Sequence, residues 1–341
     1  MGAITPAFLT DLETNMRLIS NQEYQRLTAN VWWPRVAKKT ESQNRKERLV
    51  WLLDTAKIQR TGRGGGNLEF EDLASQTYEI ESENAAGGLK IKKEQLDDLD
   101  GNGVRVAAEW SRQIGAIAGY WPQKQVAKAI LANPTTYDNV AFFSGTHYVN
   151  PYQTGLGSYS NIHTSGSGAG AVPIDTSVTL DVAVNNISKV WAYVANIKMP
   201  NGEDPRMLKL AGIMGPPALA ARMIQITNAK YIAQAATGGG AASADVEAMV
   251  RNWGLGEPII APELGAAYGG SDTDYYLLME EITTNELGAF VYVEREPFSV
   301  LYYGPQNSAQ LGRIREYQWM TEGRNVVAPG HPFLMHKCRA A

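Results

Sequence analysis

The chain has 341 residues, of which 44% are hydrophobic and 19% charged, and its formal net charge is −4. This length allows two compact domains or one domain with large extensions, and the hydrophobic content is enough for a substantial core. The charge does not favour a sequence-reading nucleic-acid binder, and one cysteine, Cys338, excludes an intrachain disulfide framework. Because no membrane-length apolar run and no signal peptide are found, we expect a soluble chain made in a reducing cytoplasm.

Residues 1–48 have the pattern of an arm rather than of a domain. A helix is predicted near their start, where apolar residues recur at helical spacing: Phe8, Leu9, Leu12, Met16 and Ile19. Trp32 and Trp33 belong to no repeated core pattern, so they need apolar cover from the chain's own body or from a neighbouring subunit. A basic stretch follows, with Lys38, Lys39, Arg45, Lys46 and Arg48.

The next segment predicts strands around a charged loop. An apolar strand over 49–53 leads into basic residues and then an acidic strand: Lys57, Arg60, Arg63, Glu69 and Glu71. Residues 78–83 alternate apolar or small residues with glutamates, and residues 89–92 alternate apolar residues with lysines. We therefore predict a hairpin that turns at Gly87-Gly88.

The longest helical signal spans residues 103–132. Its large apolar residues recur every three or four positions, which predicts one buried stripe of Val106, Trp110, Ile114, Ile117 and Trp121. Pro122 has no amide hydrogen, so a kink or a break is expected there.

The remainder of the chain mixes helices and strands. Residues 150–175 are rich in Gly, Ser and Asn, which predicts a long loop that is functional or mobile. Helices are predicted over 180–194 and after Pro216-Pro217. Strands are predicted over 207–213, 258–262, 275–279, 289–293, 298–303 and 313–320, with a second loop at 233–242. This order predicts an α+β fold.

The sequence contains no catalytic template of the types GxxxxGK[ST], HExxH, GxSxG or paired CxxC. Ser144 and His147 lie close together, but neither a group to orient the base nor an oxyanion hole can be recognised. The histidines are scattered singly: His147, His163, His331 and His336. The sequence therefore predicts no enzyme, no metal site and no cofactor.

Several segments carry a resemblance in a fixed order. They are Ile4-Thr5-Pro6-Ala7-Phe8-Leu9, Tyr78-Glu79-Ile80 through Lys93-Glu94-Gln95-Leu96-Asp97-Asp98, Phe142-Phe143-Ser144-Gly145-Thr146-His147-Tyr148, Leu208 to Met214 with Pro216-Pro217-Ala218-Leu219, and Pro297-Phe298. Together they resemble the major head subunit family of phage Mu and Mu-like prophages, the gpT family. The resemblance covers nearly the whole chain, and the glycine-rich segment 62–66 departs from it.

This resemblance implies an α+β fold of the HK97-type major capsid protein class. The parts of that fold would be an N-terminal arm (1–48), an extended loop or E-loop formed by a β-hairpin (49–88), a peripheral domain (89–175) with a spine helix (103–132), an axial domain with a mixed sheet and flanking helices (176–305), and return strands to the peripheral domain (306–341).

The resemblance also implies a function. The chain would be a structural major capsid protein of a tailed double-stranded DNA bacteriophage, and it would assemble with itself into hexamers and pentamers of an icosahedral head that encloses the genome. We expect it in the virion after assembly in the bacterial host cytoplasm. A separate scaffold protein, a portal and decoration proteins are the further partners expected, with no membrane.

Two groups of residues are expected to make contacts in such a shell. Contacts between subunits are expected at Trp32, Trp33, Lys57, Arg60, Arg63, Glu69 and Glu71, and contacts with DNA or scaffold in the lumen at Lys38, Lys39, Arg45 and Lys46. One alternative is an encapsulin-type shell that stores an enzyme rather than DNA. Another is a monomeric α+β hydrolase or ligand-binding protein that uses Ser144 and His147.

Overall fold

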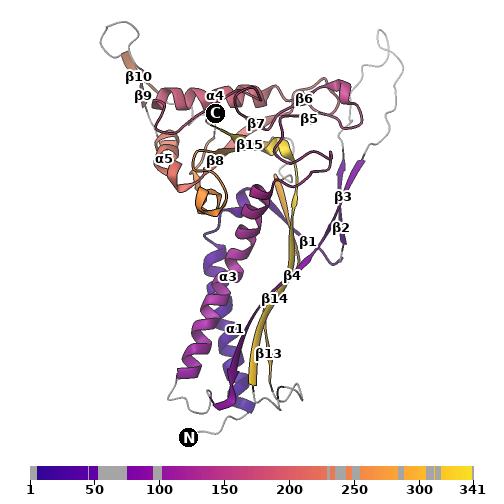
Figure 1. Ribbon diagram of the computed structural model, residues 1–341, viewed down its shortest axis with the longest axis vertical. Helices are drawn as coiled ribbons and strands as arrows, with labels where there is room; N and C mark the ends of the chain where they lie inside the picture. Colours follow the sequence, from indigo (N-terminus) through magenta and orange to yellow (C-terminus); the bar gives the residue numbers. More distant parts are fainter. Residues whose placement is uncertain are drawn as a thin grey trace.

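The computed structural model describes residues 6–44, 46–52, 75–94, 102–228, 231–234, 243–247, 254–282, 288–304, 311 and 316–339. These residues form a long stalk that carries a wider upper lobe (Figure 1). The stalk comprises α1, α3 and a four-stranded sheet, and the upper lobe comprises a five-stranded sheet with α4, α5 and the loops around them.

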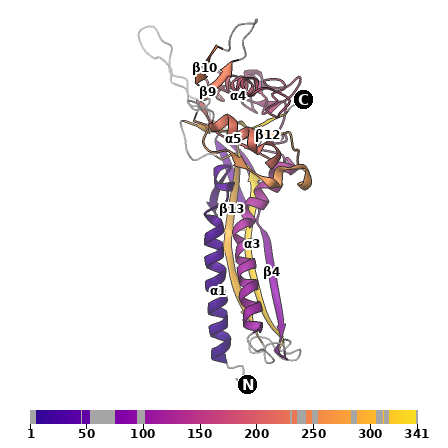
Figure 2. The ribbon, with the colours of Figure 1, turned by 90° about the vertical axis from the view of Figure 1, so that its left-hand side faces the viewer.

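In the stalk, α1 (Pro6–Thr28) and α3 (Asn102–Ala132) lie side by side on one face of the sheet (Figure 2). The strand order is β1-β13-β14-β4, where β1 is Ala37–Glu41, β13 is Phe290–Tyr303, β14 is Glu316–Pro329 and β4 is Glu83–Lys92. β1 pairs in parallel with β13, while β13, β14 and β4 pair antiparallel. The sheet thus joins the arm, the segment after the predicted loop and the last third of the chain.

In the upper lobe, the strand order is β11-β8-β12-β15-β7. These strands are β11 (Ile259–Ile260), β8 (Leu208–Gly215), β12 (Tyr275–Glu281), β15 (Met335–Cys338) and β7 (Ile162–His163). The predicted helices appear as α4 (Leu180–Ala195) and α5 (Ala220–Asn228). The largest hydrophobic core lies mainly here, with Ile187, Ile213, Met223 and Tyr275 among its fully covered side chains.

Smaller elements complete the fold. The two-stranded pairs are β2 (Lys46–Leu52) with β3 (Ser75–Glu81), β5 (His147–Tyr148) with β6 (Ser158–Tyr159), and β9 (Tyr231–Gln234) with β10 (Ser243–Glu247). The short 3-10 helices are η1 (Trp33–Arg35), η2 (Thr154–Leu156), η3 (Pro217–Leu219), η5 (Pro262–Leu264), η6 (Ala266–Tyr268) and η7 (Pro332–Leu334).

The two stalk helices approach closely because α3 presents small residues to α1. A methyl group added to Gly115 would lie 2.3 Å from the carbonyl oxygen of Ser20, and one added to Gly119 would lie 2.9 Å from that of Tyr24. Only glycine leaves room for the neighbouring backbone at such distances. The face of α3 that meets α1 is therefore set by small side chains rather than by large apolar ones.

The predicted helix over 103–132 is confirmed, but the predicted stripe is wrong in part. The helix continues through Pro122, so no break occurs there. Trp110 and Ile114 are partly buried, whereas Val106 and Ile117 are 53% and 55% exposed. The five residues do not form one buried face, because the small-residue face contacts α1.

The predicted hairpin with a turn at Gly87-Gly88 is also wrong. β4 runs straight through both glycines and pairs with β14, and β3 pairs with β2 instead. A methyl group on Gly87 would lie 3.0 Å from Cδ1 of Ile114, so this glycine admits the helix to the sheet. Glycine inside a strand has this use where another element comes close.

Other segments differ from the predicted layout. The strands expected at 289–293 and 298–303 form one strand, β13, whose register shifts between Glu294 and Ser299, around Pro297. The expected loop 150–175 includes short strands and buried residues such as Asn161 and Val172, so much of it is packed into the upper lobe. The ranges expected for the axial domain (176–305) and for the return strands (306–341) do not coincide with the two sheets. β13 of the first range lies in the stalk sheet, and β15 of the second range lies in the upper sheet.

Candidate assembly surfaces

Trp32 and Trp33, predicted as subunit contacts, are covered by their own chain. They are 9% and 6% exposed and belong to the main hydrophobic core. The backbone N–H of Trp32 donates to Oε1 of Gln123 at 3.0 Å, and the ring of Trp33 packs against Tyr292 with centroids 5.1 Å apart. Of the two expectations, the structure favours packing on the chain's own body and leaves little indole surface for a neighbouring subunit.

The two lysines of β1 have different surroundings. Lys38 is exposed, whereas the Nζ of Lys39 forms an ion pair with the carboxylate of Glu294, whose side chain is 9% exposed. Burial lowers the pKa of Lys39, but the hydrogen bond and the charge of Glu294 outweigh burial and raise this pKa overall. Lys39 therefore stabilises the contact between β1 and β13, and its contact with DNA or scaffold stays a prediction.

Lys46 lies on β2, where its Nζ is 2.6 Å from Oε1 of Glu79 on β3. Both side chains are largely solvated, so this pair contributes little to stability. The other residues of the predicted charged contacts lie outside the described residues: Arg45, Lys57, Arg60, Arg63, Glu69 and Glu71. Their contacts with an adjacent subunit or with the lumen stay predictions.

A hydrogen-bond network joins the arm, the stalk and the upper lobe. The hydroxyl of Tyr120 and Nε2 of Gln123, the latter at 2.6 Å, donate to Oε1 of Glu263 in η5. Gln123 in turn accepts from the backbone of Trp32, and burial together with Glu263 raises the pKa of Tyr120. Because Pro122 lies between Tyr120 and Gln123, the network is centred where α3 lacks one backbone hydrogen bond.

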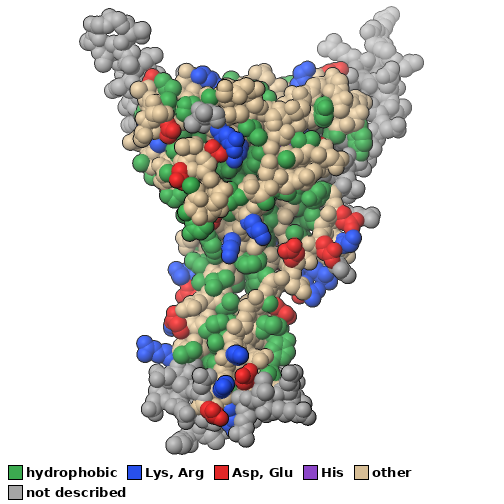
Figure 3. Space-filling model, in the orientation of Figure 1, with side chains coloured by type: hydrophobic (Ala, Val, Ile, Leu, Met, Phe, Trp, Pro, Cys, Tyr) green, Lys and Arg blue, Asp and Glu red, His purple; other side chains and the backbone are tan. Residues whose placement is uncertain are grey.

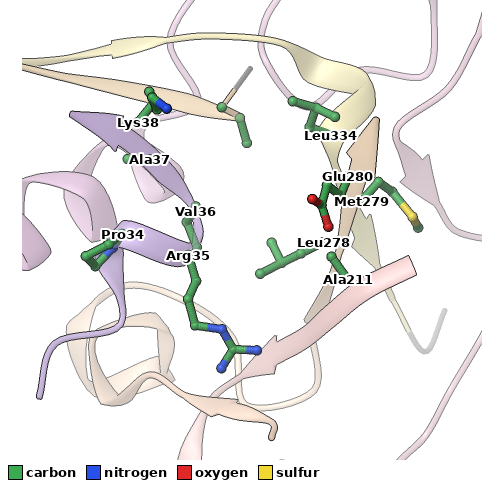
Figure 4. Close-up of a pocket in the computed structure, with 12 residues that line it drawn as sticks. Pro34, Arg35, Val36, Ala37, Lys38, Ala211, Leu278, Met279, Glu280 and Leu334 are labelled. Carbon is green, nitrogen blue, oxygen red and sulfur yellow. The ribbon is translucent and has the colours of Figure 1, made fainter. Parts of the chain in front are cut away.

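A cavity of about 350 Å³ lies between the stalk and the upper lobe (Figure 4). Arg35 and Glu280 reach it from opposite sides. Nη1 of Arg35 donates to the carbonyl oxygen of Glu257 at 3.0 Å, and Glu280 is 3.1 Å from Nζ of Lys209. Both charged groups already have partners in the chain, so the cavity supports no specific small-molecule site.

The stalk exposes large apolar side chains. Two of them were predicted to lie in the buried stripe of α3, and one was not considered. Leu18 on α1 is 55% exposed, in addition to Val106 and Ile117 on α3. Figure 3 shows hydrophobic side chains on the surface of the stalk and where it meets the upper lobe. Exposed apolar side chains on neighbouring helices are candidates for contacts with other proteins where they form a continuous patch. The spacing of Ala107, Ser111, Gly115 and Ala118 could have revealed which face of α3 is covered.

The proposed nucleophile and base of a hydrolase do not bond to each other. Nδ1 of His147 lies 2.7 Å from Oδ2 of Asp138, and its Nε2 lies 3.1 Å from the carbonyl oxygen of Phe142. Oγ of Ser144 instead lies 3.3 Å from the carbonyl oxygen of Thr146. Since both imidazole nitrogens are engaged elsewhere, His147 does not activate Ser144 in this structure.

Two histidines far apart in the sequence meet in the upper lobe. The backbone N–H of Ala169 donates to Nδ1 of His163 at 2.9 Å, so the proton of this imidazole is on Nε2. That Nε2 lies 3.1 Å from Nδ1 of His336, whose own Nε2 donates to the carbonyl oxygen of Phe333 at 3.1 Å. Burial lowers the pKa of His163 to about 4 and the pKa of His336 well below its ordinary value, so both are neutral.

Neither a metal site nor a membrane span is seen in the part of the chain that the structure describes. No three side chains of His, Cys, Asp or Glu there come close enough together to hold a metal ion. None of the described helices is long and apolar enough to cross a membrane.

The comparisons with known proteins identify a family. The family model described as Mu-like prophage major head subunit gpT matches residues 9–201, more than half of the chain. A search of curated proteins found no match.

The fold is similar to that of solved capsid structures. A capsid chain of cyanophage P-SCSP1u is 13% identical with a TM-score of 0.53, and the match covers 91% of this chain and 88% of that one. A chain of the procapsid of bacteriophage JBD30 is 16% identical with a TM-score of 0.48, over 98% of this chain and 76% of that one. The SrpI encapsulin of Synechococcus elongatus PCC 7942 is 12% identical with a TM-score of 0.47, over 91% and 87%. The predicted HK97-type capsid fold is confirmed.

Proposed function

Because the chain belongs to the Mu-like prophage major head subunit gpT family and is a phage major capsid protein, we propose that it assembles with itself into the hexamers and pentamers of an icosahedral head around double-stranded DNA. The family match over residues 9–201 is the observation that carries this proposal. The exposed apolar side chains of the stalk support it, because a subunit of a closed shell must bury such surface against its neighbours.

The parts of the molecule receive roles in this proposal. The stalk would be the peripheral domain with α3 as its spine helix, and the upper lobe would be the axial domain at the centre of each capsomer. The segment that β2 and β3 flank would be the extended loop that reaches over a neighbour. Many modest contacts of this kind reinforce one another, so a shell can resist internal pressure without one very tight bond.

The other partners follow from the same role. A separate scaffold protein would guide assembly in the bacterial cytoplasm, a portal would occupy one vertex, and decoration proteins would bind the finished virion. Lys38 and Lys46 are exposed enough to contact DNA or scaffold from the inner face. The expected contact of Arg60 and Arg63 with acidic surface on an adjacent subunit is tested by reversing both charges, which should lower the yield of shells.

The function is tested on the purified full chain by size-exclusion chromatography and negative-stain imaging. We expect megadalton particles, whereas a monomeric hydrolase or ligand-binding protein would elute near 37.3 kDa. The absorbance ratio at 260 and 280 nm of particles from infected or induced cells separates a DNA-filled head from an encapsulin-type shell. A monomer under all assembly conditions, or particles that hold an enzyme and no nucleic acid, would contradict the proposal.

A further inference from the structure

Asp138, in the turn after α3, and His147, at the start of β5, form a buried pair. Their side chains are 2% and 0% exposed, and Nδ1 of His147 lies 2.7 Å from Oδ2 of Asp138. On the other side of the ring, Nε2 lies 3.1 Å from the carbonyl oxygen of Phe142. The imidazole therefore has an oxygen acceptor at each of its two nitrogens, and no described residue donates to either nitrogen.

The pair of His163 and His336 has the opposite pattern. Each of these rings accepts one hydrogen bond and donates one. A neutral imidazole, with one N–H and one lone pair, satisfies such surroundings. It does not satisfy those of His147, because its lone pair would point at an oxygen whichever nitrogen carried the proton. The imidazolium, which donates from both nitrogens, fits there.

The proton shared by this pair belongs to His147 rather than to Asp138. Oδ1 of Asp138 accepts from the backbone N–H of Val140 at 3.1 Å and from the hydroxyl of Thr136. Hydrogen bonds of this kind favour the ionised carboxylate. Burial raises the pKa of Asp138, but the hydrogen bonds from His147 and Thr136, together with the charge of His147, outweigh burial and lower this pKa overall. The imidazolium thus faces a negative carboxylate.

We propose that His147 is held as an imidazolium cation that fastens the turn after α3 to the upper lobe, so that raising the pH loosens their junction. The carbonyl oxygen of Phe142, its second acceptor, also accepts from Nδ2 of Asn161 at 2.6 Å. The same Nδ2 donates to the carbonyl oxygen of Pro332 in η7 at 3.1 Å. The ring of Phe142 stacks on Phe290 of β13, with centroids 4.4 Å apart. The residue that His147 holds therefore contacts both the stalk sheet and, through Asn161, the upper lobe.

The other titratable groups near this pair leave Asp138 as its balancing anion. Tyr159 on β6 stacks on His147 with ring centroids 5.4 Å apart. Burial keeps this ring and three neighbouring ones neutral, because it raises the pKa of the two tyrosines and lowers that of the two histidines: Tyr137, Tyr159, His331 and His336. The charge of Arg206 also acts on both tyrosines, and its Nη1 lies 4.0 Å from Oε1 of Glu281.

Loss of the proton from His147 destabilises the folded chain, because one nitrogen lone pair would then face an oxygen inside the core. An unfolded chain releases a histidine proton around pH 6.5, whereas the folded chain keeps it in the ion pair. The stability that the pair contributes is therefore fully present below about pH 6.5 and is lost as the pH rises.

The first test detects the charge directly by NMR of the purified full chain with isotope-labelled histidine. The chain has four histidines, and all are buried. At about pH 8, where an ordinary histidine is almost wholly neutral, one imidazole should have two protonated nitrogens and the other three should have one each. His147→Gln should remove the cationic ring. Four neutral rings, or a cationic ring that survives in His147→Gln, would overturn the proposal.

The second test measures stability in urea. The unfolding equilibrium constant of the wild-type chain should rise several-fold between about pH 7 and about pH 8, with about tenfold as the limit for one proton. Asp138→Asn and His147→Gln should each flatten this rise. His336→Gln is the matched control, because it removes a buried neutral histidine and should keep the rise. No rise in the wild type, or the same rise in His147→Gln, contradicts the proposal.

Both tests are independent of the proposed function, because the pair lies inside one chain. The NMR result on the wild-type chain decides the charge of His147 even where a variant fails to fold. A neutral His147 removes the proposed cation and leaves the role as head subunit intact. A wild-type chain that forms no particles removes that role, and the charge of His147 is still measured.

Discussion

The stalk and the upper lobe differ in the kind of contacts that hold each of them together within the single chain. In the upper lobe, polar groups such as those of Asn161 and His163 are buried and bonded to segments far away in the sequence. The stalk instead packs by the close approach of two helices and keeps Val106 and Ile117 exposed, and no strand among the described residues pairs with the outer side of β4. The upper lobe therefore buries more of its polar groups within the monomer. Both regions expose large apolar side chains, such as Met207 and Tyr268 in the upper lobe, so we expect assembly to cover surface on both.

The largest effect is expected from filling the contact between the stalk helices. Gly115→Ala should destabilise the unassembled chain by about 3 kcal/mol, because its Cβ would force α1 away from α3. A loss of stability would be informative, because at an exposed helix position alanine stabilises a helix by about 1 kcal/mol relative to glycine. Denaturant unfolding measures the change.

Gly155→Ala serves as the control, because a Cβ there has no neighbour within 4 Å among the described residues. Its free energy of unfolding should stay within about 0.5 kcal/mol of the wild-type value. Equal stabilities of the Gly115→Ala and Gly155→Ala variants would show that the stalk helices are not packed as closely as described.

The upper lobe should respond to acid through its buried histidine pair. Burial holds the pKa of His163 at about 4, below the ordinary value of 6.5, so the folded chain binds fewer protons than the unfolded chain between these values. The stability that neutral His163 contributes is fully present above the ordinary histidine pKa, and it is lost as the pH falls toward the lower pKa that His163 has in the folded chain. His163 alone should lower the free energy of unfolding by about 2 kcal/mol between neutral pH and about pH 5.

His163→Gln tests this by removing the titrating group while it keeps a donor toward His336. The variant should be less stable at neutral pH, since the N–H of Ala169 loses its acceptor, but its stability should fall less on acidification. Urea titrations of both proteins at the two pH values measure the difference. The same fall in the variant and in the wild type would exclude His163 as the source.

The smallest effect is expected at the contact between the arm and the stalk sheet. Lys39→Met should destabilise the chain by about 1 kcal/mol, because the buried carboxylate of Glu294 loses its cation, and the partial exposure of Lys39 keeps the effect small. Lys38→Met, one residue away and exposed, is the matched control and should change stability by less than about 0.5 kcal/mol. A thermal unfolding series that ranks the two variants equally would remove the assigned role of Lys39.

Local patterns predicted much of the fold. The helical spacing of Leu9, Leu12 and Met16 predicted α1, and that of Val184, Ile187 and Val194 predicted α4. These local patterns gave a wrong prediction where the same residues are compatible with two different structures. Gly87-Gly88 can form a turn or admit a helix, and the position of Ile114 decides between them.

The candidate surfaces were less predictable than the elements. The sequence suggested that Trp32 and Trp33 need cover, but whether their own chain supplies it depends on Gln123 and Tyr292, which lie far along the chain. Likewise, the helical spacing of the large apolar residues of α3 did not separate exposed from buried side chains, and the signal for the covered face was the spacing of its small residues, Ala107, Ser111, Gly115 and Ala118.

The sequence by itself determined the α+β order of the elements and the ordered motifs of the Mu-like head subunit family, because periodicity and short motifs are local properties. Only the tertiary structure decided that α1 is the element that packs on the small-residue face of α3, that β4 is an edge strand, and that His163 meets His336. Each of these depends on contacts between residues distant in the sequence, which no local pattern encodes.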